Sequence, residues 1–140
     1  MNTLKMTVIA VSIAMSLAAA AYAGSVKLAG DFLNNDNTSE ENARFYVVDC
    51  KKPGKICASI KDGGFHFDNI FGAAVECEGD ADQDSADKPG GKAKACAECA
   101  GNEALIVLFC DESSPFCDDG FTAKVKCKGH VEHFIEIPPP

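Results

Sequence analysis

Alternating apolar and polar residues predict strands in several parts of the chain. The pattern is clearest over residues 121–128, where every second side chain is apolar or cysteine and the others are Thr122 and three lysines. Successive side chains of a strand point to opposite faces of a sheet, so this segment has a core face and a lysine face. Further strands are predicted at Arg44–Cys50, Glu103–Cys110 and Val131–Ile137. Ile56–Ile60 is expected to be the return strand that follows Arg44–Cys50.

The predicted strands at residues 121–128 and 131–137 are close enough in sequence to form a hairpin. A three-residue loop at 128–130 places Lys126 opposite Glu132 and Val125 opposite His133, whereas a two-residue loop places lysine opposite apolar residues. A slip of one residue inverts a whole face of a strand, so the odd loop is favoured. In this register Val131, His133, Ile135 and Ile137 share one face, and the prolines from Pro138 onward end the strand.

The middle of the chain is harder to assign. Glu103–Cys110 is continuously apolar, which is typical of a central strand buried on both faces. Residues 65–77 are apolar with no clear period, residues 78–94 predict the longest loop, and the alanine-rich Ala93–Ala100 predicts about two turns of helix. The fold class expected is mainly β, a small antiparallel sheet or sandwich with one short helix. If residues 65–77 are helical, the alternative is α+β.

Residues 1–23 resemble a secretory signal. Lys5 precedes an apolar run at Met6–Leu17, and Ala21–Ala23 matches the small-x-small pattern of a cleavage site. The apolar run is too short for a membrane-spanning helix, so we expect cleavage after Ala23 and no membrane anchoring afterwards. The domains expected are the signal at 1–23, a polar arm at 24–42 and a single disulfide-rich domain at 43–140.

Composition limits the function further. The chain of 140 residues has a net charge of −8, and cleavage lowers this to −9 because Lys5 is the only charged residue of the leader. Such an excess of acid argues against binding nucleic acid by phosphate neutralisation. A hydrophobic content of 46% excludes a wholly disordered chain. Asn37 starts an N-x-S sequon, which is a glycosylation candidate only in a eukaryotic secretory pathway.

An even number of cysteines in an exported chain predicts disulfides. Eight cysteines allow 105 pairings, among which the sequence cannot choose. Cys96 and Cys99 form a C-x-x-C motif, typical of a redox pair or half of a zinc site, but an oxidising compartment favours two structural half-cystines with separate partners. The eight cysteines expected in disulfides are Cys50, Cys57, Cys77, Cys96, Cys99, Cys110, Cys117 and Cys127.

No metal or other cofactor is expected. His130 and His133 are three residues apart, which on a strand directs them to opposite faces and prevents a compact site. Asp80, Asp82 and Asp84 resemble the start of a calcium loop, although a glycine and a closing glutamate are missing where such a loop needs them. A solvated acidic loop is the default interpretation, and calcium binding by residues 78–87 stays open.

Two classes of function remain. One is a secreted ribonuclease-like enzyme or other small hydrolase, in which His66 acts with His133 or Glu132 and a cation such as Arg44 stabilises charge. No spacing of these residues matches a ribonuclease motif, and the sequence has no G-x-S-x-G, P-loop or H-E-x-x-H motif. The favoured class is a secreted, cysteine-rich binding protein without catalysis.

As a whole, the chain resembles the fungal small secreted cysteine-rich proteins, many of which are candidate effectors. The resemblance rests on the cleavable leader, the short mature chain, the eight cysteines and the polar arm. Tyr46–Cys50 is loosely similar to the aromatic-x-cysteine start of ribonuclease-like mildew effectors, with two extra residues. The resemblance implies an extracellular location, resistance to proteases and an interaction surface whose partner is a protein or a cell-wall or host ligand.

Overall fold

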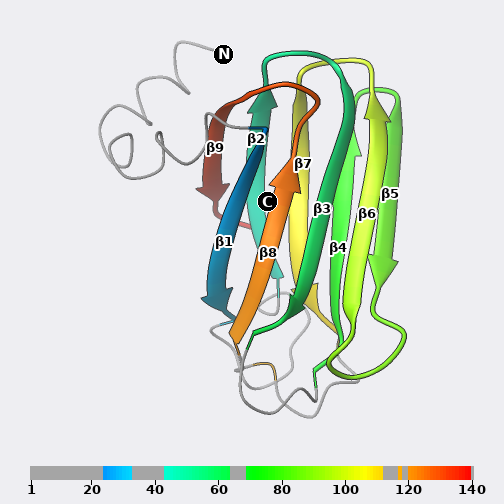
Figure 1. Ribbon diagram of the computed structural model, residues 1–140, viewed down its shortest axis with the longest axis vertical. Coiled ribbons are helices and arrows are strands. Elements are labelled where there is room, and N and C mark those ends of the chain that lie inside the picture. The colour runs from blue at the N-terminus through cyan, green and yellow to red at the C-terminus, as the bar shows by residue number, and fades with distance from the viewer. Residues whose placement is uncertain (1–23, 33–42, 64–68, 112–116, 118–119, 140) are drawn as a thin grey trace.

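A computed structural model describes residues 24–32, 43–63, 69–111, 117 and 120–139. These residues contain nine strands, and no helix among them is long and apolar enough to cross a membrane (Figure 1). The strands are β1 (Ser25–Asp31), β2 (Ala43–Cys50), β3 (Gly54–Asp62), β4 (Phe71–Cys77), β5 (Asp80–Ser85), β6 (Lys92–Cys99), β7 (Glu103–Cys110), β8 (Gly120–Lys126) and β9 (Val131–Ile137).

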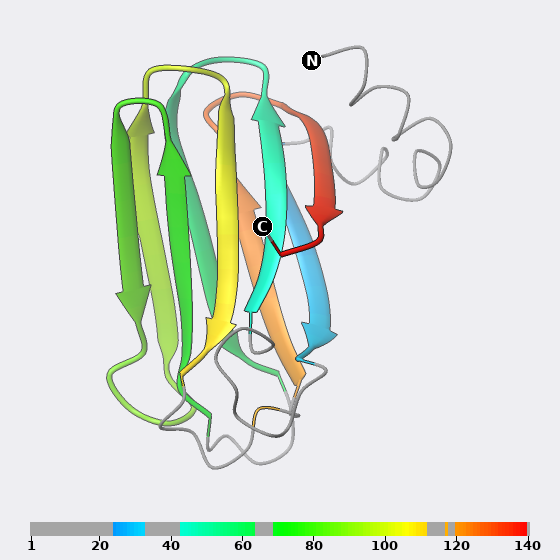
Figure 2. The same cartoon turned by 180° about the vertical axis from the view of Figure 1, so that it is seen from behind.

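The strands form two antiparallel sheets that face each other as a sandwich. Sheet A has the order β1-β8-β3-β6 and lies nearer the viewer in Figure 1. Sheet B has the order β5-β4-β7-β2-β9 and lies nearer the viewer in Figure 2. The predicted mainly β fold is therefore confirmed, in the form of a sandwich.

Most consecutive strands belong to different sheets. Among the described strands, β4 and β5 alone follow each other in sequence and also pair, through a turn at Glu78 and Gly79, where Gly79 has a φ of +94°. Glycine adopts such a φ without the steric cost of a Cβ. The predicted return of residues 56–60 onto residues 44–50 is wrong, because β2 lies in sheet B and β3 in sheet A.

The predicted hairpin between residues 121–127 and 131–137 is also wrong. β8 pairs with β1 and β3 in sheet A, while β9 pairs with β2 in sheet B. β8 buries its apolar side against sheet B, whereas β9 buries Val131 and Phe134 and leaves Ile135 and Ile137 partly exposed on the outer face. A bulge between Asp49 and Cys50 shifts the register, so Val131 is buried while His133 points outward with Ile135 and Ile137.

The alternation that predicted β8 is confirmed by the burial of its residues. Phe121, Ala123 and Val125 are buried, while Lys124 and Lys126 are exposed on the outer face of sheet A. The predicted central position of residues 103–110 is confirmed as well, because β7 is the middle strand of sheet B. Its burial on both faces is wrong, since alternate side chains from Leu105 to Phe109 lie partly exposed on the outer face.

Three assignments in the middle of the chain need correction. Residues 80–85 of the predicted loop form β5, and residues 71–77 form β4, so this segment is not helical. The predicted helix at 93–100 is strand β6. Small alanines alternate there with polar residues, and burial of the alanines against sheet B outweighs their helix propensity. The part of the predicted core at 64–68 lies outside the described residues.

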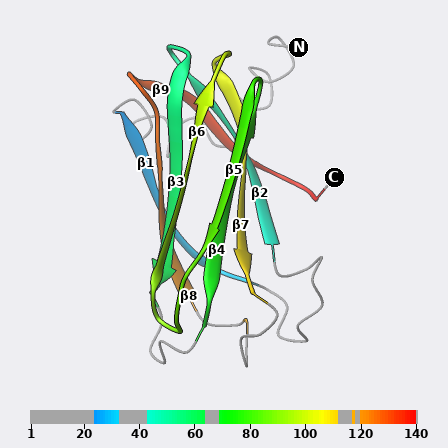
Figure 3. The same ribbon diagram turned by 90° about the vertical axis from the view of Figure 1, so that its right-hand side faces the viewer.

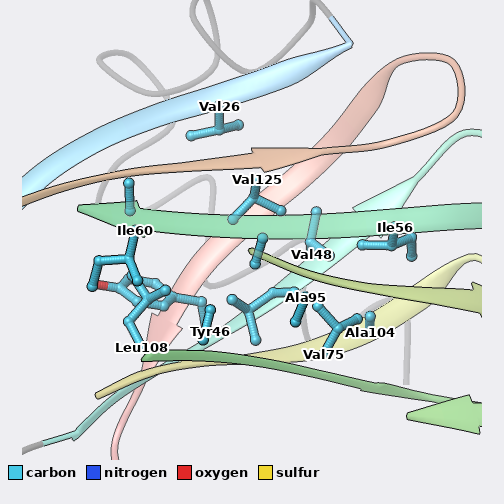
Figure 4. Packing of buried hydrophobic residues seen from close by; sticks show 14 of the residues in the cluster. Val26, Tyr46, Val48, Ile56, Ile60, Val75, Ala95, Ala104, Leu108 and Val125 are labelled. Atoms are coloured by element: carbon cyan, nitrogen blue, oxygen red, sulfur yellow. The ribbon is translucent and has the colours of Figure 1, made fainter. Parts of the chain in front are cut away.

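The core lies between the two sheets and is supplemented by disulfides. Figure 4 shows side chains from both sheets, including Val26, Val48 and Leu108, directed toward one another. All eight cysteines are paired, as the even count predicts. Cys50–Cys127 and Cys77–Cys99 connect the two sheets at one end, Cys57–Cys96 joins β3 to β6, and Cys110–Cys117 closes a short segment.

Tyr46 lies in this core with only 3% of its surface exposed. Its ring stacks on Phe134 with the two ring centroids 5.1 Å apart. Burial disfavours the charged phenolate and raises the pKa of Tyr46 to about 12. The stabilisation from this shift is fully present below the unfolded pKa of about 10 and is lost as pH rises through about 12.

We expect the chain that starts at Gly24 to show one tyrosine titration with a midpoint near 12. Tyr22 leaves with the leader and the chain has no tryptophan, so the ultraviolet absorbance of tyrosinate reports Tyr46 alone. The same chain unfolded in urea is the control and should titrate near 10, as a solvated tyrosine does. A folded chain that also titrates near 10 would contradict the burial of Tyr46.

Candidate functional site

The outer face of sheet A is rich in lysine although the whole chain is acidic. Its four strands alternate between the core and solvent, and exposed lysines are the most frequent residue at the outward positions. The carboxylates on outward positions, Asp31 and Glu98, lie at opposite margins of the face. The seven exposed lysines of this lysine face are Lys27, Lys55, Lys61, Lys92, Lys94, Lys124 and Lys126.

Two pairs of lysines on this face lie directly opposite each other on neighbouring strands. Lys27 of β1 pairs with Lys124 of β8, and Lys61 of β3 pairs with Lys92 of β6. Like charges in directly opposite positions destabilise a sheet. Within the described ranges, no carboxylate lies within ion-pair distance of any of these four lysines. The repulsion between the two ammonium groups of each lysine pair is therefore not offset by a nearby carboxylate on the lysine face.

A hollow of about 630 Å³ lies between these two lysine pairs. Both pairs line it, together with the small side chains of Ala29, Ser59 and Thr122. The hydroxyl oxygen of Thr122 has no hydrogen-bond partner in the part of the chain that the structure describes. The hollow thus has lysines around it and small or apolar residues, Leu28, Ile60 and Ala123 among them, in the rest of its lining.

The strand β6 contributes Lys92 and Lys94 to the lysine face, and three carboxylates of β5 hold it in place. Figure 3 views the side of the sandwich where β5 and β6 lie next to each other. The backbone N–H groups of Lys94, Cys96 and Glu98 donate hydrogen bonds to Asp84, Asp82 and Asp80, each at 2.8 Å. We call these three interactions the carboxylate ladder.

The carboxylate ladder has a local cause in both strands. β5 pairs with β4 through its backbone, so its alternate aspartates all point toward β6. Every second residue of β6 from Ala93 to Ala97 is a buried alanine, and these short side chains let the sheets approach closely. The resemblance of Asp80, Asp82 and Asp84 to a calcium loop therefore reflects a strand whose carboxylates accept backbone hydrogen bonds.

The outer face of sheet B has the opposite character. Its middle strands present partly exposed apolar side chains, and the ring of Phe109 covers Gly72 so closely that a Cβ there would collide with it. A second hollow of about 430 Å³, near the start of β7, is lined by Glu76, Glu78 and Glu103. The apolar residues are Phe45, Val47, Leu105, Val107, Phe109, Ile135 and Ile137.

Arg44 connects the sheets on the side away from β5 and β6. Its guanidinium donates two hydrogen bonds to the carboxylate of Glu136, at 2.9 and 2.8 Å, and one to the backbone oxygen of Asp31 at 3.1 Å. It also lies 5.8 Å from the ring centroid of Phe121. The hydrogen bond to Glu136 raises the pKa of Arg44, so the charged form is strengthened in this position.

Two of the acid–base residues predicted for the enzymatic alternative, Glu132 and His133, are described, and both belong to β9. His130 is exposed before β9, Glu132 is exposed at the bulge, and His133 is partly exposed on the outer face of sheet B. His66 and Asn37 lie outside the described residues. Among the residues that are described, no group of three or more His, Cys, Asp or Glu residues is arranged to hold a metal ion.

The sequence pattern predicts only part of the lysine face. The alternation at 122–128 identified the contribution of β8. Lys92 and Lys94 show the same period of two, but the sequence there predicts a loop at 78–94 and, because it is rich in alanine, a helix at 93–100. Lys27 lies in a segment that was assigned to the polar arm. The spacing of the lysines therefore indicates that they lie on one side of each strand, but it does not indicate which distant strands pair.

Comparisons with known proteins leave the family open. No protein-family model and no curated protein matches the chain. A solved structure described as the C-terminal domain of EclA, a sugar-binding protein, is similar over 82% of this chain and 78% of its own, with a TM-score of 0.40 and 8% identity. RmlC from Streptococcus suis, solved with dTDP-D-xylose, is similar over 87% of this chain, with a TM-score of 0.21 and 14% identity; the match spans 53% of RmlC.

We expect Asp82→Ala to lower the free energy of unfolding by about 1 kcal/mol, because the N–H of Cys96 loses its acceptor in the carboxylate ladder. The control is Gln83→Ala, which removes an exposed side chain from the other face of β5 and should change stability little. Urea denaturation of both variants measures the difference. Equal stabilities for Asp82→Ala and Gln83→Ala would contradict a structural role for the ladder.

Proposed function

We propose that the mature chain is an exported, effector-like binding protein that acts outside the cell without catalysis and binds an acidic ligand on the lysine face. One observation carries this proposal: two pairs of lysines occupy directly opposite positions on neighbouring strands around one hollow. The pairs are Lys27 with Lys124 and Lys61 with Lys92. An arrangement that costs stability in the free protein becomes favourable when an anion lies between the ammonium groups.

The distribution of charge supports the same proposal. The lysines gather on the outer face of sheet A, whereas Glu76, Glu78 and Glu103 line a hollow on sheet B. A local positive potential can therefore attract an acidic ligand even though the net charge of the whole chain is negative. The interaction should weaken as salt screens these exposed charges.

Export rests on two independent features. The leader at 1–23 has the composition of a secretory signal. Four disulfides are consistent with an extracellular protein, since such bonds persist in oxidising compartments. A four-disulfide sandwich is also compatible with a binding role, because crosslinks hold a surface in shape during exposure to proteases.

Binding through the lysine face can be tested on a sulfonate cation-exchange resin at pH 7 and low salt. We expect the wild-type protein to be retained despite its negative net charge, and Lys61→Glu with Lys92→Glu to elute at clearly lower salt. The control, Lys51→Glu with Lys52→Glu, changes the net charge equally at exposed positions of the β2–β3 turn. Flow-through of the wild type, or equal losses in both variants, would contradict the proposal.

Export can be tested by mass spectrometry of the protein recovered from the culture medium of its native cells. We expect a chain that starts at Gly24 and is lighter by eight hydrogens than its reduced form, because all eight cysteines are paired. An intact leader with free thiols in material recovered from inside the cells would contradict the proposal. This result is independent of the resin experiment.

A further inference from the structure

The two lysine pairs of the hollow are arranged diagonally. Lys27 and Lys124 share one cross-strand row with Ser59 and Lys94. The next row contains Ala29 and Thr122 with Lys61 and Lys92. Neighbouring strands are about 4.8 Å apart and alternate rows about 6.8 Å apart, so the backbone midpoints of the two pairs lie roughly 12 Å apart. This separation exceeds what one small anion can span.

The positions between the lysine pairs are small and polar. The other diagonal of the same two rows pairs Ser59 with Lys94 and Thr122 with Ala29. Of these residues Ala29, Ser59 and Thr122 line the hollow. The hydroxyl oxygen of Thr122 is buried, whereas Ser59 is partly exposed, so Ser59 is the residue whose hydroxyl a ligand in the hollow can reach. The centre of the hollow is therefore suited to hydroxyl groups, while its two ends are suited to carboxylates.

We infer that the lysine face binds a linear acidic polysaccharide of the polyuronate class, which crosses the strands from one lysine pair to the other. The inference rests on the proposed function, because it names the ligand of the same face. A polyuronate carries a carboxylate on each sugar and hydroxyl groups between them, which matches two ammonium clusters with the hydroxyl of Ser59 between them.

Other polyanions fit this face less well. Single-stranded nucleic acids are bound by aromatic side chains on which bases stack, and no outward strand position of sheet A in the described ranges is aromatic. Arg44, the only arginine and the residue type best suited to phosphate, is bonded to Glu136 away from the hollow. Membrane binding at an interface uses apolar side chains beside the basic ones, and this face has lysines, small residues and a disulfide.

The test is calorimetric titration of the mature, oxidised protein with galacturonate oligomers. We expect the hexamer to bind at least ten times more tightly than the dimer, because only the longer chain reaches both lysine pairs. A methyl-esterified hexamer keeps the hydroxyl groups and loses the charges, so it should bind at least ten times more weakly than the free acid. Equal binding of the dimer and the hexamer, or of the acid and its ester, would overturn the inference.

Variants separate the two lysine pairs and the floor of the hollow. Lys27→Glu with Lys124→Glu, and Lys61→Glu with Lys92→Glu, should each weaken hexamer binding about tenfold or more, since each removes two charge contacts and adds repulsion. Ser59→Ala removes the partly exposed hydroxyl of the hollow, and should weaken hexamer binding without changing retention on the sulfonate resin. The charge-matched control, Lys51→Glu with Lys52→Glu, should bind like the wild type.

Competing ligands complete the experiment. Single-stranded RNA and vesicles of anionic lipid, at matched charge, should bind more weakly than the uronate hexamer. Tighter binding of either would overturn the polysaccharide assignment. If the protein is retained on the sulfonate resin through the lysine pairs but does not bind the hexamer, the inference fails while the proposed function stands. If it is not retained, the proposed function fails.

Discussion

The carboxylate ladder between β5 and β6 is the interaction on which the lysine face depends. β6 is the outermost strand of sheet A and has one backbone partner, β3. Its other edge presents N–H groups that would otherwise be open to water or to another chain. Asp80, Asp82 and Asp84 of sheet B accept hydrogen bonds from three of these N–H groups. A set of acidic side chains therefore holds in place the strand that contributes Lys92 to the hollow.

The same strand is also fixed on its opposite edge and at its end. Cys96 is bonded to Cys57 directly across the β3–β6 pair, and Cys99 is bonded to Cys77 of sheet B. The ladder and the two disulfides thus fix β6 against both sheets. Rigid elements hold charged groups at defined separations better than loops do, and such preorganisation lowers the cost of binding.

The location of the acidic residues explains how an acidic chain can keep a positive face. The aspartates of β5 lie between the sheets at the side of the sandwich, and Glu136 is bonded to Arg44 at the other side. The glutamates of the second hollow belong to sheet B. The four lysines around the hollow therefore have no carboxylate within ion-pair distance in the described part of the chain, and the net charge alone says little about the ligand.

Local patterns in the sequence predicted elements better than their pairing. The alternation from Phe121 to Cys127 located β8 and its lysine side because one face of that strand is buried. The alanines of β6 misled the assignment, since alanine favours helices unless tertiary packing buries every second residue. Lys61 and Lys92 are neighbours only because distant strands pair, and no local signal encodes that contact. The two predicted hairpins are wrong for a related reason: the connections from β2 to β3 and from β8 to β9 cross from one sheet to the other, and no local signal encodes this.

The binding face can be mapped most directly by amide nitrogen–proton correlation spectra of the mature protein during addition of a galacturonate hexamer. Amide signals of Lys27, Ser59, Lys61, Lys92, Thr122 and Lys124 should shift together, while those of Val47 and Val107 on the outer face of sheet B stay in place. Shifts concentrated on sheet B, or no shifts at all, would contradict the assignment of the lysine face as the ligand site.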